Sequence, residues 1–194
     1  MAKVLQKVNI SLNASDADAL TKEISTEQVR KVVISMPNGK ATGINGLPYE
    51  LWKSLIQLEE SEPKVYGSCT AKLLSTVYSN ISAYGLCSTS DFAKGWLCPL
   101  YKKNDRHEIT NYCPITLLNC NYKILTKLLA LQMVSTLPKV IHCDQAGFVP
   151  GCSISDQIKL TQMIQAYAEL DNDFGGVLVG LDQEKAYDKI LHVQ

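Results

Sequence analysis

The residue with the clearest chemical potential is Asp182, which follows the apolar run Gly-Val-Leu-Val-Gly-Leu at residues 176–181. Such a run predicts a buried strand that holds the carboxylate rigidly at its end. A carboxylate in that position can ligate metal ions for phosphoryl chemistry, in which two ions bind the attacking and the leaving oxygen. A second acid, an aromatic residue and a third acid follow at Glu184, Tyr187 and Asp188. The alternative interpretation of Asp182 is a helix cap after a strand.

Several helices and one further strand are expected to support this carboxylate. Periodicity and capping residues predict helices from Ser25 to about residue 36, over 49–58, 71–83 and 122–137, and from Ser153 or Ser155 to about residue 170. The helix over 122–137 has the widest apolar face, so it should be central to the core and end at Pro138. Residues 96–101 predict a strand, and Pro99 indicates an edge or a bulge. Residues 1–24 predict a linker or a frayed N-terminus.

Two loops carry exposed bases. Residues 39–46 are rich in glycine and include Lys40, but they lack the spacing of a phosphate-binding loop, so a flexible connection is the simpler interpretation. Lys102, Lys103 and Arg106 follow the predicted strand in a turn. Adjacent bases at a strand end commonly do no more than make a hairpin soluble.

The charges are distributed unevenly along a chain of 194 residues whose net charge is zero. Residues 94–139 hold seven bases against two acids, a net of +5, and residues 140–194 hold three bases against eight acids, a net of −5. A basic middle and an acidic end suit a protein that holds a polyanion with one part and cations with another. Two ordinary solvated faces would explain the same pattern.

The cysteines and the hydropathy favour an intracellular location. Seven cysteines are scattered with no C-x-x-C pair and no histidines at zinc-finger spacing, which favours free thiols in a reducing compartment. The N-terminal residues lack the apolar stretch of a secretory signal, and no window approaches the ~18 apolar residues of a membrane span. We therefore expect a soluble chain with no membrane partner, and the sequence does not distinguish nucleus from cytoplasm.

Four motifs in a fixed order resemble the reverse transcriptase of LINE-type, non-LTR retrotransposons. They are M-P-N-G-K-A at 36–41 with G-L-P at 46–48, P-L-Y-K-K at 99–103 with N-Y-C-P-I at 111–115, D-Q-A-G-F-V-P-G at 144–151, and L-D-Q-E-K-A-Y-D at 181–188. The resemblance implies RNA-templated DNA synthesis. The implied fold class is α+β, a right-hand polymerase with helix-rich fingers over 25–170 and the start of the palm, with its first strand, over 171–194.

The resemblance also implies roles for individual residues. Asp182 matches the first catalytic aspartate of the palm, which is a ligand of Mg²⁺. Lys102 matches a fingers lysine that faces the triphosphate, with Lys103 beside it, and Tyr187 matches the aromatic residue under the incoming sugar. Without the resemblance, Tyr187 would be interpreted as a core tyrosine. A turn close to the nucleotide and the template is matched by Gln145, Gly147, Phe148 and Gly151. The implied partners are an RNA template, a DNA primer and deoxynucleotide triphosphates.

The chain departs from the family pattern at several of these positions. Cys113 stands where related elements usually have an arginine, so a bidentate contact with the triphosphate is missing. Arginine is also common at the positions of His107 and Cys152, and proline and aspartate are common at those of Thr42 and Asn45. Together these changes suggest a copy that has accumulated mutations without selection for activity.

The metal site is expected to be incomplete in this chain. The family's second metal-binding element is a hairpin with two adjacent aspartates, and no adjacent aspartate pair occurs in this sequence. Asp182 alone cannot hold two ions, so we expect a reverse-transcriptase fragment without catalytic activity of its own. The alternatives are a non-catalytic remnant that binds RNA or an RNA/DNA hybrid through its basic region, and an interaction module built from the apolar helices.

Overall fold

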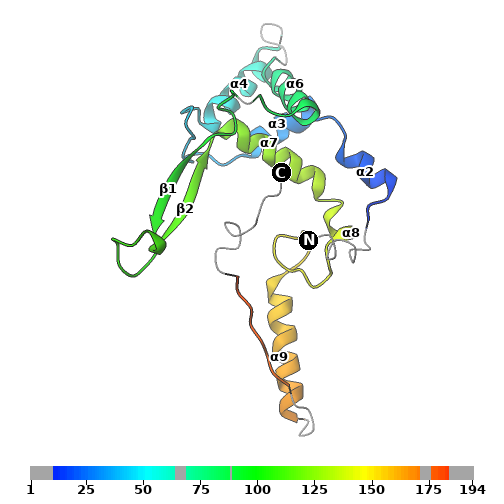
Figure 1. The fold of residues 1–194 in the computed structure, drawn as a ribbon. Helices are drawn as coiled ribbons and strands as arrows, with labels where there is room; N and C mark the ends of the chain where they lie inside the picture. The colour runs from blue at the N-terminus through cyan, green and yellow to red at the C-terminus, as the bar shows by residue number, and fades with distance from the viewer. Residues whose placement is uncertain (1–10, 64–68, 88, 171–175, 184–194) are drawn as a thin grey trace. The chain divides into compact units, whose positions relative to one another are not determined.

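The computed structural model describes residues 11–63, 69–87, 89–170 and 176–183. In chain order, the elements are α2 (Ala14–Leu20), α3 (Thr26–Ser35), α4 (Tyr49–Ser61), α6 (Cys69–Tyr84), β1 (Gly95–Tyr101), η1 (Ile109–Asn111), β2 (Tyr112–Leu118), α7 (Cys120–Met133), α8 (Leu137–Val140) and α9 (Ile154–Leu170), as drawn in Figure 1. The chain forms two compact units, Met1–Ile141 and His142–Gln194. This boundary differs from the predicted boundary between residues 170 and 171.

Helix α3 begins where its sequence predicts. The backbone N–H of Gln28 donates to Ser25 Oγ at 3.2 Å, and the N–H of Ser25 donates to Gln28 Oε1 at 2.9 Å. This reciprocal pair satisfies two N–H groups that would otherwise lack partners at the helix start. The helix ends before Pro37, as predicted, because a residue preceding proline disfavours helical backbone angles.

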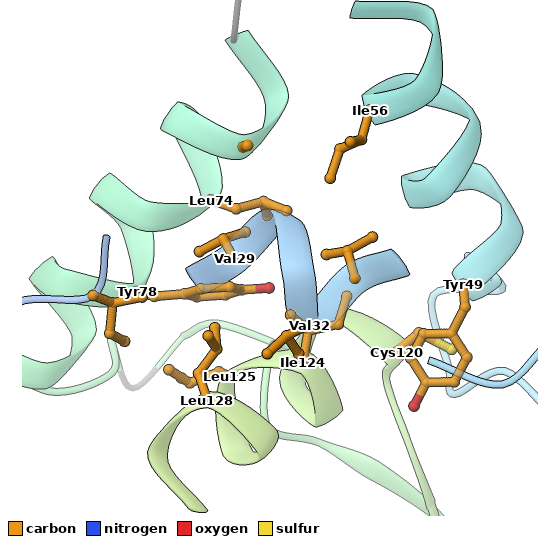
Figure 2. Close-up of a cluster of buried hydrophobic side chains, with 13 residues drawn as sticks. Val29, Val32, Tyr49, Ile56, Leu74, Tyr78, Cys120, Ile124, Leu125 and Leu128 are labelled. Carbon is orange, nitrogen blue, oxygen red and sulfur yellow. The ribbon is translucent and has the colours of Figure 1, made fainter. Parts of the chain in front are cut away.

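The core of the first unit lies between α3, α4, α6 and α7. Figure 2 shows side chains from all four helices converging there, including Val29, Ile56, Tyr78 and Ile124, each of which is fully buried. Burying an aliphatic side chain of this size contributes roughly 1.5–3 kcal/mol. The Tyr78 hydroxyl donates to the carbonyl of Asn121 at 2.9 Å, so its polar atom keeps a partner inside the core. The predicted central place of α7 is confirmed.

Strands β1 and β2 form an antiparallel hairpin that leads into α7 (Figure 1). The predicted strand over 96–101 is confirmed within β1, whereas the strand at Tyr112–Leu118 is not among the predicted elements. Pro99 pairs with Pro114 in the register, which a two-stranded ribbon tolerates because both strands are edges. The hairpin is not buried, and Trp96 and Leu97 expose 64% and 61% of their surface.

The predicted linker over residues 1–24 contains a helix in its described part. Asn13 caps α2, and its side chain accepts the N–H of Asp16 at 2.8 Å. Asp16 also forms a 2.6 Å ion pair with Lys139 of α8, which ties the two helices together. Residues 14–20 are therefore helical, which the linker prediction did not include.

The end of α7 also differs from the prediction. The helix stops at Met133, four residues before the predicted end, and Pro138 lies inside the following short helix α8. Proline is tolerated there because the N–H groups of a first helical turn have no partner within the helix.

In the second unit, α9 confirms the predicted helix that ends at about residue 170. Residues 176–183 form no strand, and Val177 and Leu181 expose 90% and 93% of their surface. The prediction of a buried strand is therefore not met. A strand needs a neighbour for its backbone hydrogen bonds, and no strand occurs among the described residues of the second unit. No helix in the described part of the chain is long and apolar enough to span a membrane.

Candidate nucleic-acid interface

The loop that joins β1 to β2, residues 102–111, is held in shape by its own hydrogen bonds. The N–H of Lys102 donates to the carbonyl of Asn111 at 3.0 Å, which closes the loop at its base. The Tyr101 hydroxyl donates to the carbonyl of Asn104 at 2.6 Å, and the Tyr112 hydroxyl donates to that of Arg106 at 2.8 Å. Asn104 has a φ of +68°, in the left-handed region that asparagine tolerates better than most residues. The loop thus presents its side chains from an ordered backbone.

Arg106 lies over the ring of Tyr101, which in turn packs against Tyr112. Its guanidinium lies 4.6 Å from the centre of the Tyr101 ring, and that ring meets Tyr112 edge-on with 5.6 Å between centroids. A cation over an aromatic face gains about 0.5–1 kcal/mol at an exposed site. The stacking limits the rotamers of Arg106 and leaves its N–H groups free to bind an anion, because a guanidinium can donate bidentate hydrogen bonds to phosphate.

Lys102 and Lys103 lie beside Arg106 on the same loop and are exposed. Neither lysine forms a salt bridge within the described part of the chain. Of the two acids in the loop, Asp105 accepts hydrogen bonds from the backbone N–H and the ring of His107, both at 2.9 Å. These hydrogen bonds lower the pKa of Asp105, the backbone N–H having the larger effect. The carboxylate is therefore turned toward His107 and does not pair with the neighbouring bases.

A second feature of the first unit is the buried side chain of Asn119, between β2 and α7. Asn119 is 2% exposed and bonds to two distant segments. Its Oδ1 accepts the N–H of Asn45 at 3.1 Å, and its Nδ2 donates to the carbonyls of Asp91 and Phe92 at 2.9 and 3.2 Å. Asn119 thus joins the loop 39–46 to the chain that enters the hairpin. We call this set of contacts the Asn119 clamp.

The loop 39–46 has further fixed contacts on both sides of the clamp. Lys123 Nζ donates to the carbonyl of Ala41 at 3.3 Å, and Glu50 Oε1 accepts the N–H of Gly39 at 2.6 Å, which lowers the pKa of that carboxyl. The loop packs so closely that a Cβ built on Gly43 would lie 2.6 Å from the Cα of Asn119. These contacts favour a fixed loop over the flexible connection that its sequence suggests, and the close approach of Asn119 requires a glycine at position 43.

The remaining predicted site residues belong to the second unit. In the turn formed by Gln145, Gly147, Phe148 and Gly151, Gln145 Nε2 donates to the carbonyl of Gly147 at 3.2 Å. Phe148 and Gly151 have φ values of +61° and +82°, and the Phe148 side chain is fully exposed. An exposed aromatic residue in left-handed backbone is unusual and marks this turn as a candidate contact surface. Lys102 and Lys103, by contrast, belong to the first unit.

Asp182 is exposed in the extended segment 176–183. Among the described residues it belongs to no cluster of three or more side chains that could hold a metal ion. The described residues around Asp182 therefore do not fit a two-ion magnesium site, which needs several carboxylates. Tyr187 and Asp188 lie outside the described residues.

Comparison with known proteins connects the chain to a mobile element. No protein-family model matches the sequence. Over 179 residues, 90% of this chain, the sequence is 28% identical to the uncharacterized 149 kDa protein of transposon TX1 from Xenopus laevis. The chain spans 12% of the length of that protein. It is therefore similar to one part of a much longer transposon protein.

Proposed function

We propose that this chain is part of the RNA-directed DNA polymerase of a LINE-type, non-LTR retrotransposon. The observation that carries the proposal is the similarity to a transposon protein over 90% of the chain. The four motifs that resemble those of reverse transcriptases, which occur in order along the sequence, support polymerase activity as the function. In this proposal, residues 25–170 correspond to the fingers and residues 171–194 to the start of the palm.

Within this polymerase, the loop 102–111 contacts phosphate groups of the nucleotide or of the nucleic acid. The bases Lys102 and Lys103 are free of ion pairs among the described residues, and Arg106 is held by Tyr101 on an ordered loop. Neutralising phosphates releases condensed counterions, so such a contact strengthens as the salt concentration falls. The function proposed for the chain by itself is binding of RNA or of an RNA/DNA hybrid.

The chain alone is proposed not to catalyse polymerisation. Asp182 would provide one ligand for Mg²⁺, and two-ion phosphoryl transfer needs further carboxylates in the same place. Cys113 stands where related elements usually have an arginine, and that arginine is expected to bind the triphosphate. The Cys113 side chain is exposed on β2, and a thiol there cannot replace a bidentate cation.

Removing the three bases of the loop should weaken binding and reduce its dependence on salt. For Lys102→Ala/Lys103→Ala/Arg106→Ala, we expect affinity for single-stranded RNA to fall about tenfold or more at about 50 mM salt. The slope of log affinity against log salt should become shallower by about 2, because each lost phosphate contact contributes about 0.7. Fluorescence anisotropy of labelled RNA and of an RNA/DNA hybrid, titrated at several salt concentrations, measures both quantities.

The matched control removes three exposed lysines from other parts of the first unit, Lys22→Ala/Lys72→Ala/Lys127→Ala. It changes net charge equally but should leave most of the affinity and the slope intact. Equal losses in the two triple variants would assign binding to overall charge and refute a specific role of the loop. Absence of binding at every salt concentration would refute the binding function altogether.

Primer extension tests the catalytic part of the proposal. With an RNA template, a DNA primer, Mg²⁺ and all four deoxynucleotide triphosphates, we expect no extension by the chain and none by Asp182→Asn. A competent reverse transcriptase on the same template serves as the positive control. Extension that occurs with the chain and disappears with Asp182→Asn would show that the carboxylate acts in catalysis, although the described residues place it in no metal-binding cluster.

A further inference from the structure

A tight turn at the start of the second unit carries three different metal-binding side chains in succession. The N–H of Gln145 donates to the carbonyl of His142 at 3.0 Å, which closes the turn. His142, Cys143 and Asp144 lie within this turn, are exposed, and place their ligand atoms within 4.8 Å of one another. They form the one such group found among the described residues. Neither the family resemblance nor the transposon relative assigns a role to this group.

The separations between these ligand atoms are close to those of a tetrahedral zinc site. Zinc bonds of about 2.0–2.3 Å place neighbouring ligands about 3.4–3.6 Å apart. Here Cys143 Sγ lies 3.9 Å from His142 Nδ1 and 3.8 Å from Asp144 Oδ1, and His142 Nδ1 lies 3.4 Å from the other carboxylate oxygen of Asp144, Oδ2. With one ligand atom taken from each residue, all separations stay within 4.8 Å, so shifts of about 1 Å in these exposed side chains would let them share one ion.

We propose that His142, Cys143 and Asp144 form a zinc-binding site. A thiolate, an imidazole and a carboxylate are the three ligand types that Zn²⁺ takes in proteins, whereas Mg²⁺ and Ca²⁺ prefer oxygen ligands throughout. Binding releases the thiol proton of Cys143 to solvent, and the sulfur bonds to the ion as a thiolate. The N–H of Asp144, which donates to His142 Nδ1 at 3.2 Å, gives up that contact to the metal. Because the turn is exposed, water completes the coordination.

The proposal predicts that Cys143 is a thiolate ligand, which Co²⁺ substitution can detect by absorption spectroscopy. Titrating the full chain with Co²⁺ should produce a thiolate-to-metal absorption band that saturates near one equivalent and is abolished by Zn²⁺. Cys143→Ser should remove this band and weaken Zn²⁺ binding by more than the roughly 10- to 100-fold that loss of an outer-shell partner costs. His142→Ala should weaken Zn²⁺ binding similarly while retaining a weaker band.

The matched control is Cys152→Ser, which removes another exposed cysteine of the same unit. It should leave the band and the Zn²⁺ affinity unchanged. Circular dichroism of each variant verifies that the helices persist, as expected for changes in an exposed turn. The proposal is overturned if the chain gives no saturable band, or if the band survives Cys143→Ser, because the ion is then held by other cysteines.

Discussion

Replacing Asn119 with alanine is expected to lower the free energy of unfolding of the first unit by about 3 kcal/mol. The change deprives the N–H of Asn45 and the carbonyls of Asp91 and Phe92 of hydrogen bonds of 2.9 to 3.2 Å. A buried polar group left without a partner costs about 1–3 kcal/mol. Because Asn119 is 2% exposed, water replaces these bonds poorly, and the costs of the three groups accumulate.

Urea denaturation followed by circular dichroism measures the loss, with Asn121→Ala as the matched control. Asn121 is partly exposed, and its Oδ1 accepts the N–H of Tyr122 at 3.1 Å and Nδ2 of Asn45 at 3.4 Å. Solvent can replace both contacts, so we expect a loss of about 1 kcal/mol or less. Similar losses for Asn119→Ala and Asn121→Ala would contradict the clamp.

The helices of the core were predictable because their signals are local. Ser25 and Gln28 are three residues apart, and the sequence alone identifies them as a reciprocal cap. The apolar face of the helix over 122–137 likewise needs no knowledge of its neighbours. Local signals were also missed, since Asn13 followed by Asp16 is a recognisable cap of α2.

The clamp could not be predicted, because it depends on contacts between distant parts of the sequence. Asn119 is separated from Asn45 by 74 residues and from Asp91 by 28. Asparagine before a helix predicts a cap, yet Asn119 makes no side-chain hydrogen bond to its own helix. Its side-chain amide instead forms hydrogen bonds with Asn45 and with residues 91 and 92.

The apolar run before Asp182 shows the same limit. Its composition predicts a buried strand, but burial and strand pairing are supplied by other segments. In the described structure the run is extended and exposed. The sequence therefore indicates that the segment is suited to form a buried strand, but a neighbouring strand must be present for it to form.

The candidate interface was predicted in part. The sequence placed Lys102 and Lys103 in an exposed loop after a strand, and the structure confirms this position. It did not predict that Arg106 stacks on Tyr101 or that Asp105 turns toward His107. Both contacts depend on the conformation of a ten-residue loop, which residue types alone do not specify.

Replacing Gly43 with alanine should destabilise the first unit by about 1–3 kcal/mol, since overpacking a tight contact typically costs this much. The new methyl group would lie 2.6 Å from the Cα of Asn119 and closer still to its backbone nitrogen, so backbone has to move. The sign of the change in the free energy of unfolding distinguishes a fixed loop from a flexible one. In a flexible connection, alanine would stabilise the fold by about 0.4–1 kcal/mol, because it restricts the unfolded chain.

Two further variants, measured by urea denaturation, test whether the loss of stability in Gly43→Ala arises from the Asn119 clamp. Gly180→Ala is the matched control, since a Cβ at Gly180 meets no atom within 4 Å and its φ is not positive; we expect the stability of the first unit to be unchanged. The double variant Gly43→Ala/Asn119→Ala should lose less stability than the sum of the two single losses, because both changes disrupt the contact between loop 39–46 and the start of α7. Additive losses would mean that the glycine and the asparagine act independently, and the clamp would then not be one structural unit.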